Sequence, residues 1–248
     1  MFGLEVNGNE SEFTIRAYSG PADVFIPASY NGIPFTAISP LAFENSDITS
    51  ITFEDGSQIK TIGLGAFRGS KNLKTVIIPD SVEAIYGQAF SGCTALESVI
   101  IPNSVTSIGE YAFYQCTALE SIVIPESVTT IGRYTFAGCT SLESLIIEES
   151  GGSMSIGENA FSGNLSLSSV VIPARVRWVA YLTFRNCPNL REVEFKADFS
   201  TNLVAGRTTV EPNSFDGDLY NKFRNGGAGV YTTTDATDPG DTTWTKQP

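Results

Sequence analysis

Four cysteines have the widest choice of chemistry in this chain, because a thiolate can act as a nucleophile, bind a metal or form a disulfide. They are Cys93, Cys116, Cys139 and Cys187, and the spacings between them are 23, 23 and 48 residues. Zinc sites use close pairs such as C-x-x-C, which these spacings do not provide. Each cysteine instead follows a phenylalanine by three residues. We therefore predict free thiols that occupy one buried structural position.

Carboxylates are the remaining candidates for acid–base chemistry, because the chain contains no histidine. That absence excludes Ser-His-Asp and Cys-His catalysis as well as histidine-ligated metal sites. Glu97, Glu120 and Glu143 are spaced by 23 residues, and Lys74 and Arg191 fall in the same register. This pattern favours an exposed acidic edge over a catalytic pair of carboxylates. No catalytic, cofactor-binding or metal-binding residue is predicted, and we expect a non-enzymatic protein without a cofactor.

The charge balance indicates which classes of partner this protein is not expected to bind, since acidic proteins repel polyanions. The 248 residues include 15 Lys and Arg against 27 Asp and Glu, a net charge of −12. Nucleic acids and anionic membrane surfaces need a basic footprint, so neither is expected as a partner. A hydrophobic share of 42% is enough for one domain with a sizeable core. No apolar run is long enough to span a bilayer, and the first residues lack the pattern of a signal peptide.

The elements that position these residues are internal repeats. One phenylalanine column recurs every 23 to 25 residues, at Phe43, Phe67, Phe90, Phe113, Phe136, Phe161 and Phe184. A leucine column keeps the same register, at Leu73, Leu96, Leu119, Leu142, Leu167 and Leu190. Such a period indicates a solenoid in which each coil buries its apolar side chains against its neighbours. Seven or eight coils fit between residues 23 and 199.

The unit that begins at Leu96 shows how one coil is built. Leu96, Val99 and Ile101 follow the spacing L-x-x-V-x-I, which places all three on the inner side of a short strand. Pro102 ends that strand, because proline has no N–H for a ladder hydrogen bond. Gly109 is predicted to allow a tight backbone bend before the chain turns back toward the core.

The full unit, L-x-x-V-x-I-P-x-x-V-x-x-I-G-x-x-A-F-x-x-C, resembles the BspA-like leucine-rich repeat. The resemblance covers residues 23–199, with departures at Tyr86, Glu148, Val179-Ala180 and the two-residue insertion around Gly151-Gly152. It implies a right-handed coil of leucine-rich type, with a parallel sheet on one face and loops or short 3₁₀ turns opposite.

The same resemblance implies a function and a location. BspA-like proteins are bacterial surface proteins, so we expect a cell-surface or secreted module for protein binding or adhesion. Its partners would be extracellular or cell-surface proteins of a host or a neighbouring cell. A structural spacer or self-associating stalk without a dedicated ligand is the alternative.

Both ends of the solenoid are expected to be capped, because an open end exposes core and an unpaired strand edge. Residues 1–22 are predicted to form a capping hairpin around an Asn7-Gly8 turn. Residues 200–248 are assigned to a C-terminal cap and a Thr-rich tail, with helical spacing over 215–224. The tail either forms a last hairpin across 238–241 or stays mobile.

The outward positions of the strands are the candidate binding surface, since the inward positions are fixed by L-x-x-V-x-I. Five consecutive coils place a β-branched apolar residue outward, at Ile77, Ile100, Val123, Ile146 and Val171. Beside them runs a row of hydroxyls, at Thr75, Ser98, Ser121, Ser144 and Ser169. A partner-binding strip, a self-association surface and plain strand propensity all remain compatible with this pattern.

Overall fold

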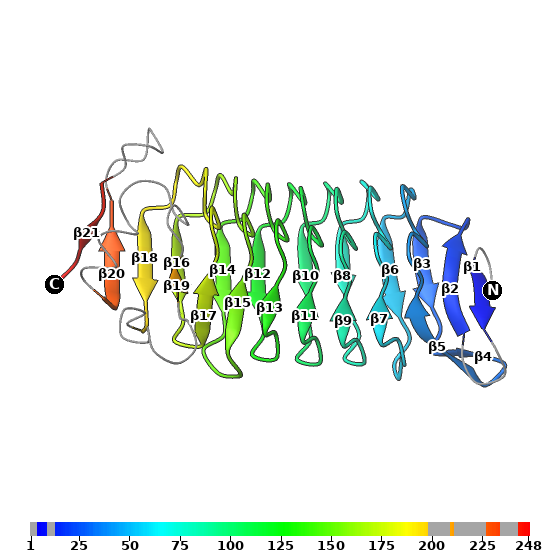
Figure 1. Cartoon of the computed structure of the whole chain (residues 1–248). Helices are drawn as coiled ribbons and strands as arrows, with labels where there is room; N and C mark the ends of the chain where they lie inside the picture. Colours follow the sequence, from blue (N-terminus) through cyan, green and yellow to red (C-terminus); the bar gives the residue numbers. More distant parts are fainter. Residues whose placement is uncertain (1–3, 9–12, 198–208, 211–226, 234–242) are drawn as a thin grey trace.

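A computed structural model describes residues 4–8, 13–197, 209–210, 227–233 and 243–248. In it the chain winds into an elongated solenoid whose coils stack in sequence order, with β1 and β21 at opposite ends (Figure 1). This confirms the parallel-strand solenoid that the repeats predict. The described residues contain no helix.

One face of the solenoid is a row of short parallel strands that we call the first sheet. Its members are β3 (Asp23–Ile26), β6 (Ser50–Phe53), β8 (Thr75–Ile77), β10 (Ser98–Ile100), β12 (Ser121–Ile124), β14 (Ser144–Ile147), β16 (Ser169–Ile172) and β18 (Glu192–Phe195). The paired groups are β3-β6-β8-β10, β12-β14 and β16-β18, which lie side by side along the molecule. Along each strand buried and solvent-facing residues alternate, as a sheet with one buried face requires.

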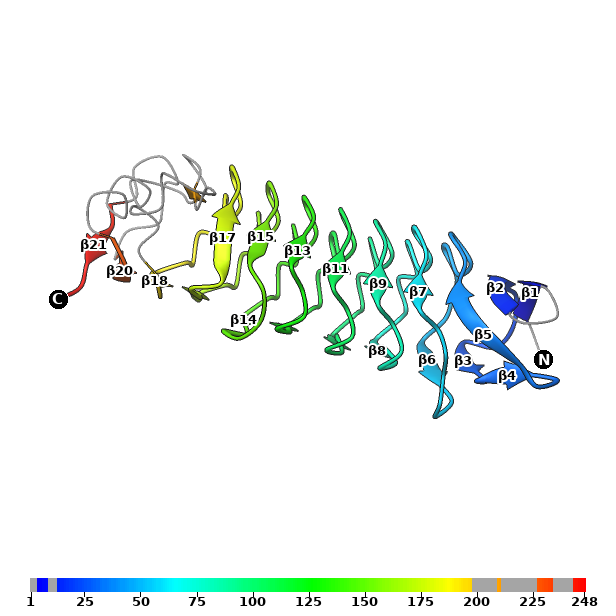
Figure 2. The same cartoon turned by 60° about the horizontal axis from the view of Figure 1, so that its bottom comes forward.

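A second sheet of parallel strands runs along another side of the coils (Figure 2). It consists of β5 (Ile33–Ile38), β7 (Thr61–Ile62), β9 (Ala84–Ile85), β11 (Ser107–Ile108), β13 (Thr130–Ile131), β15 (Met154–Ile156), β17 (Val176–Val179) and β19 (Thr209–Val210). The short hairpin strand β4 (Ser29–Tyr30) pairs with β5. The sequence predicted only loops or 3₁₀ turns away from the first sheet. The described residues hold turns on one side but no 3₁₀ segment, and this second sheet was missed because most of its strands are two residues long.

The remaining side, which we call the turn side, is formed by residues 110–118 and their equivalents in other coils. Behind it lies the phenylalanine column, from Phe43 to Phe184, with every ring buried. Consecutive rings stack with centroids 4.9 to 5.4 Å apart and planes within 13° of parallel. Because each ring contacts the rings above and below, the column ties neighbouring coils together.

Glycine serves coil stacking rather than the predicted bend. A Cβ on Gly109 would lie 2.5 Å from the backbone nitrogen of Gly87 in the preceding coil, and its φ is not positive. Gly132 meets the backbone of Glu110 in the same way, at 2.6 Å. The tight turns are instead made by residues with positive φ, among them Tyr111 at 58° and Gln115 at 55°. The interpretation of Gly109 as a bend was therefore wrong, because the sequence does not show how closely coils approach.

The two ends carry antiparallel strands. β1 (Leu4–Gly8) pairs with β2 (Phe13–Tyr18), and Gly8 lies opposite Phe13 inside the ladder, so the predicted turn at Asn7-Gly8 was wrong. β2 in turn pairs with β5 of the second sheet. At the other end β20 (Gly229–Thr232) and β21 (Thr245–Lys246) extend the first sheet from β18. Tyr231 and Trp244 are buried there. The helix predicted over 215–224 lies outside the described residues.

Candidate functional site: the outer face of the first sheet

The five predicted apolar residues form a continuous exposed row, which we call the apolar strip. The exposed fractions are 67% for Ile77, 59% for Ile100, 45% for Val123, 51% for Ile146 and 38% for Val171. The residue before each one in its strand is buried, as Val99 is in β10. The alternation predicted from the sequence is therefore confirmed in all five coils.

The hydroxyl row lies next to the apolar strip and is also exposed, at Thr75, Ser98, Ser121, Ser144 and Ser169. Among the described residues, none of these hydroxyls has a hydrogen-bond partner in the protein, in contrast to Ser50, which donates to Asp23 over 2.7 Å. The structure thus places together all ten residues that the sequence nominated. Ten neighbouring positions offer apolar contact and unused hydrogen-bonding groups on one face.

Carboxylates border the strip before the strands begin. Glu97, Glu120 and Glu143 are exposed, and none of them forms an ion pair with another described residue. They occupy one position in three successive coils, so their charges repel one another across a short distance. This is the solvated acidic edge that the sequence predicts.

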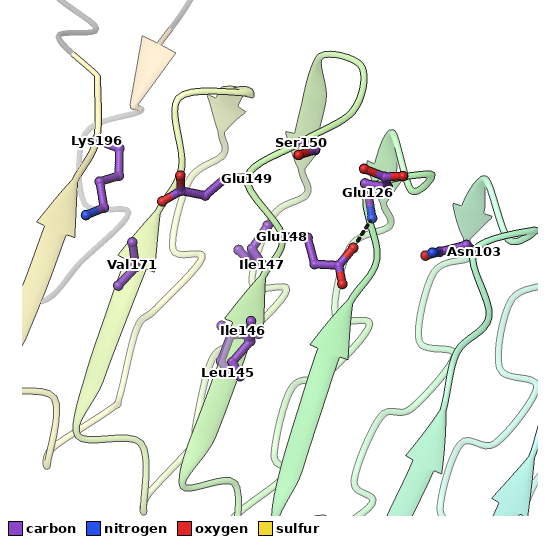
Figure 3. Close-up of a pocket in the computed structure, with 10 residues that line it drawn as sticks. All are labelled: Asn103, Glu126, Leu145, Ile146, Ile147, Glu148, Glu149, Ser150, Val171 and Lys196. Carbon is purple, nitrogen blue, oxygen red and sulfur yellow. Dashed lines mark hydrogen bonds between the residues drawn. The ribbon is translucent and has the colours of Figure 1, made fainter.

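A second group of carboxylates borders the other end of the strands, around a depression of about 740 Å³ (Figure 3). Glu126, Glu148 and Glu149 line it together with Ile146 and Val171 of the strip. The carboxylate of Glu148 accepts a hydrogen bond from the Glu126 backbone N–H at 2.8 Å, which holds the rim in place. The cation in the lining is Lys196, which pairs with Glu194 at 2.7 Å. Sequence reasoning did not predict this depression.

Arg175 supports that rim from beneath, and sequence reasoning missed it. Its side chain is buried and donates to the carbonyl of Glu148 at 2.5 Å, of Val128 at 2.8 Å and of Pro125 at 3.0 Å. Burial lowers the pKa of Arg175, while Glu148 and Glu126 oppose that shift. Arg175 thereby spans the coil that contains the two-residue insertion.

One signal in the sequence marks this residue. Arg175 occupies the position of Ser104 and Ser127, whose hydroxyls donate to the carbonyls of Val82 and Val105 at 2.6 Å. A break in that serine column at the coil after an insertion indicates a longer donor that reaches further back.

The cysteine column is a structural feature of the turn side. All four thiols are free and buried, and each donates to the carbonyl of a phenylalanine 26 residues earlier. Burial raises the pKa of Cys93 and Cys139 to about 12 and also raises the pKa of Cys116. Such thiols stay protonated and unreactive at neutral pH.

Three other residues occupy the same column, at Ser46, Ser70 and Asn164. Ser70 makes the equivalent hydrogen bond to the Phe43 carbonyl at 2.7 Å, whereas the buried amide of Asn164 has no partner for either polar atom. In the described part of the chain, no group of three His, Cys, Asp or Glu side chains is arranged to hold a metal ion.

The repeat pattern can be compared with known families at this point. A model of the BspA type leucine rich repeat region matches residues 36–155 and 118–203, in six copies. The chain belongs to the BspA-type leucine-rich repeat family. No catalytic family is indicated, and the family and fold are those of repeat proteins that are generally non-enzymatic.

Solved structures of leucine-rich repeat proteins share the fold. A leucine rich cell surface protein from Faecalibacterium prausnitzii is 31% identical, with a TM-score of 0.69 over 78% of this chain and 53% of its own. A leucine-rich repeat protein from Bacteroides ovatus is also 31% identical, with a TM-score of 0.68 over 79% of this chain and 52% of its own. The chain therefore spans about half the length of these two relatives.

A third structure is closer to this chain in length. The T. pallidum leucine rich repeat protein is 25% identical, with a TM-score of 0.59 over 77% of this chain and 78% of its own. A search of curated proteins gives no match. Within the described ranges of this BspA-type chain, no helix has the length and apolar character that crossing a bilayer requires.

Proposed function

We propose that this BspA-type solenoid is a non-enzymatic protein-binding module whose contact surface is the apolar strip with its hydroxyl row. The observation that carries the proposal is the exposure of five β-branched apolar side chains on five consecutive coils, each beside an unpaired hydroxyl. Soluble proteins seldom leave a contiguous apolar surface without a use. An apolar centre with hydrogen-bonding and charged groups around it is the usual composition of a protein interface.

The location follows the family. A similar structure carries the description of a cell surface protein, so we place the module at the cell surface or in the secreted fraction, with an adhesive role. Its partners would be extracellular or surface proteins of a host or a neighbouring cell.

Self-association through the same strip is less favourable on electrostatic grounds. A second copy would bring its own Glu97, Glu120 and Glu143 toward a surface that already carries unpaired carboxylates on both borders. Like charges brought together and desolvated at an interface cost binding free energy. A spacer without a ligand would need no such strip, and hydrophilic side chains could occupy its outward positions.

The experiment is capture of purified extracellular-matrix and cell-surface proteins by the immobilised chain. The test variant is Ile100→Lys with Val123→Glu, which places charges in the strip and leaves the core untouched. The control variant is Leu64→Lys with Tyr86→Glu, which makes the same change at two exposed apolar residues beyond the second sheet.

We expect the test variant to lose the captured protein and the control variant to retain it, both at unchanged melting temperature. Full binding by the folded test variant would place the contact surface elsewhere. The purified chain should show no turnover above that of buffer in hydrolase and transferase assays, since the described residues contain no catalytic constellation.

A further inference from the structure

The spacing of the apolar strip restricts the shape of what can lie on it. Neighbouring strands of a sheet are about 4.8 Å apart, and the stacked phenylalanine rings of these coils are 4.9 to 5.4 Å apart. The strip therefore offers one apolar side chain roughly every 5 Å along the solenoid axis.

An α-helix has nearly the same repeat. Its pitch is about 5.4 Å, so a helix laid along the axis presents one side chain per turn to one side chain per coil. An extended strand presents side chains on one face about every 6.7 Å, and it loses register within two coils. Five coils span about 20 Å, which corresponds to a helix of roughly 14 residues.

The charges on the two borders agree with a helix of ordinary width. Around Val123, carboxylates stand three residues before and three residues after, at Glu120 and Glu126. Around Ile146 they stand at the same two positions, at Glu143 and Glu149. Three extended residues span about 10 Å, so each acidic border lies about 10 Å from the centre of the strip. A helix is about 10 Å wide, and a Lys or Arg side chain on its flank can reach that far from the helix axis.

None of these carboxylates forms an ion pair among the described residues, although Glu126 interacts electrostatically with Arg175 and Glu149 with Lys196. All four are exposed. Lys196, the cation beside the depression, is paired with Glu194. Positive charge on the flanks of a bound helix would remove the repulsion within both acidic borders.

We propose that the apolar strip binds a cationic amphipathic helix of about 14 residues, laid along the solenoid axis across β8 to β16. Its apolar side chains follow the spacing i, i+4, i+7, i+11 toward the strip, and Lys or Arg residues on both flanks meet the two acidic borders. The inference rests on the proposed function and specifies the partner's secondary structure and charge.

The test uses two synthetic, fluorescently labelled peptides of about 18 residues with identical Leu and Lys content. In the helical probe five leucines follow i, i+4, i+7, i+11 and i+14. In the control probe the same five leucines alternate with lysines along one continuous stretch, as on a strand, and the remaining residues are unchanged in number and type. We expect the helical probe to bind about tenfold more tightly by fluorescence anisotropy, and more weakly at 300 mM than at 50 mM NaCl.

Two triple variants that each replace three carboxylates with amides distinguish the effect of the acidic border from the effect of the protein's net charge. Glu97→Gln with Glu120→Gln and Glu143→Gln should weaken the helical probe about tenfold. Asp47→Asn with Glu83→Gln and Glu158→Gln makes the same change in net charge away from the strip, and should weaken it less than twofold. All three control positions are exposed.

Equal affinity for the two probes, absence of binding by the helical probe, or equal effects of the two triple variants would overturn the inference. The proposed function fails by a different result, namely capture of a protein partner that survives Ile100→Lys with Val123→Glu. If a protein partner is captured through the strip but the helical probe does not bind, the proposed function is retained and the inference of a helical partner is rejected.

Discussion

The outer face of the first sheet and the turn side both recur in every coil, yet their exposed side chains differ in whether they contact one another. Those of the turn side pair and stack within the protein, whereas, among the described residues, the hydroxyl row and the acidic edge of the sheet face do not. On the turn side Arg133 pairs with Glu110 at 2.9 Å and lies 5.8 Å from the centroid of the Tyr111 ring. Tyr111 stacks on Tyr134 with centroids 4.9 Å apart. On the sheet face the hydroxyl row and Glu97, Glu120 and Glu143 have no such partners among the described residues.

The contrast shows which exposed groups are available to a partner. Groups that already stack and pair along the solenoid would have to give up those contacts on binding, whereas unpaired groups lose only water. Availability of this kind, more than exposure alone, singles out the sheet face, since Leu64, Tyr86 and Tyr181 of the other sides are also exposed.

The largest effect should come from the core that both faces share. Phe113→Ala removes a ring stacked between Phe90 and Phe136, and it should lower the free energy of unfolding by about 3–5 kcal/mol. Ile100→Ala, at an exposed position of β10 in the same coil, should change the free energy of unfolding by less than about 0.5 kcal/mol. Denaturant melts of the two variants check this. Similar losses in both would mean that the apolar strip is part of the core.

The next effect concerns the support beneath the acidic rim. Arg175→Leu removes the donors to the carbonyls of Glu148, Val128 and Pro125, and it should cost about 3 kcal/mol because buried carbonyls lose their partners. Arg185→Leu, at an exposed residue, is the control and should cost little. Thermal melts measure both. A stable Arg175→Leu variant would show that the insertion coil holds its shape without the guanidinium.

The buried thiols predict a stability that depends on pH. Their pKa values lie well above the ordinary value of 9.0, at about 12 for Cys93 and Cys139. Above pH 9 the unfolded chain therefore releases thiol protons that the folded chain retains, so folding stability falls as pH rises through 9 toward 12. Between pH 7.5 and 9.5 three such thiols should lower the free energy of unfolding by about 2.5 kcal/mol.

A serine variant isolates this contribution. Cys93→Ser with Cys116→Ser and Cys139→Ser keeps a donor of the kind that Ser70 provides and removes the titrating groups. Urea melts at both pH values should show a smaller loss for the variant than for the parent chain. Thiol counting at pH 7.5 should detect four groups in denaturant and almost none in the native protein; rapid labelling of the native chain would contradict burial.

The smallest effect should come from Asn164, whose buried amide has no partner. Asn164→Cys restores the residue that most coils use there, and it should raise stability by about 1 kcal/mol. Asn164→Ala serves as a comparison, since it removes the unsatisfied amide without adding a donor. Melting temperatures of the two variants check the prediction. A loss of stability in Asn164→Cys would show that the turn at this coil differs from its neighbours.

The sequence alone determined the period, the coils and the inward and outward positions of the first sheet. Each of these depends on spacing within one unit, such as L-x-x-V-x-I from Leu96 to Ile101, and repetition makes the spacing unmistakable. The ten residues of the apolar strip and hydroxyl row were therefore identified correctly as neighbours on one exposed face.

The tertiary structure decided whatever depends on contact between coils. Two-residue strands such as Ser107–Ile108 are too short to carry an alternating pattern, so the second sheet becomes visible only when coils pair. Gly109 is needed because the preceding coil approaches within 2.5 Å of where its Cβ would lie. Arg175 reaches carbonyls 47 and 50 residues earlier. The physical reason is common to all three. The spacing of residues within one coil determines whether a side chain points inward or outward, whereas the distance between coils is set by stacking, which the sequence of a single coil does not specify.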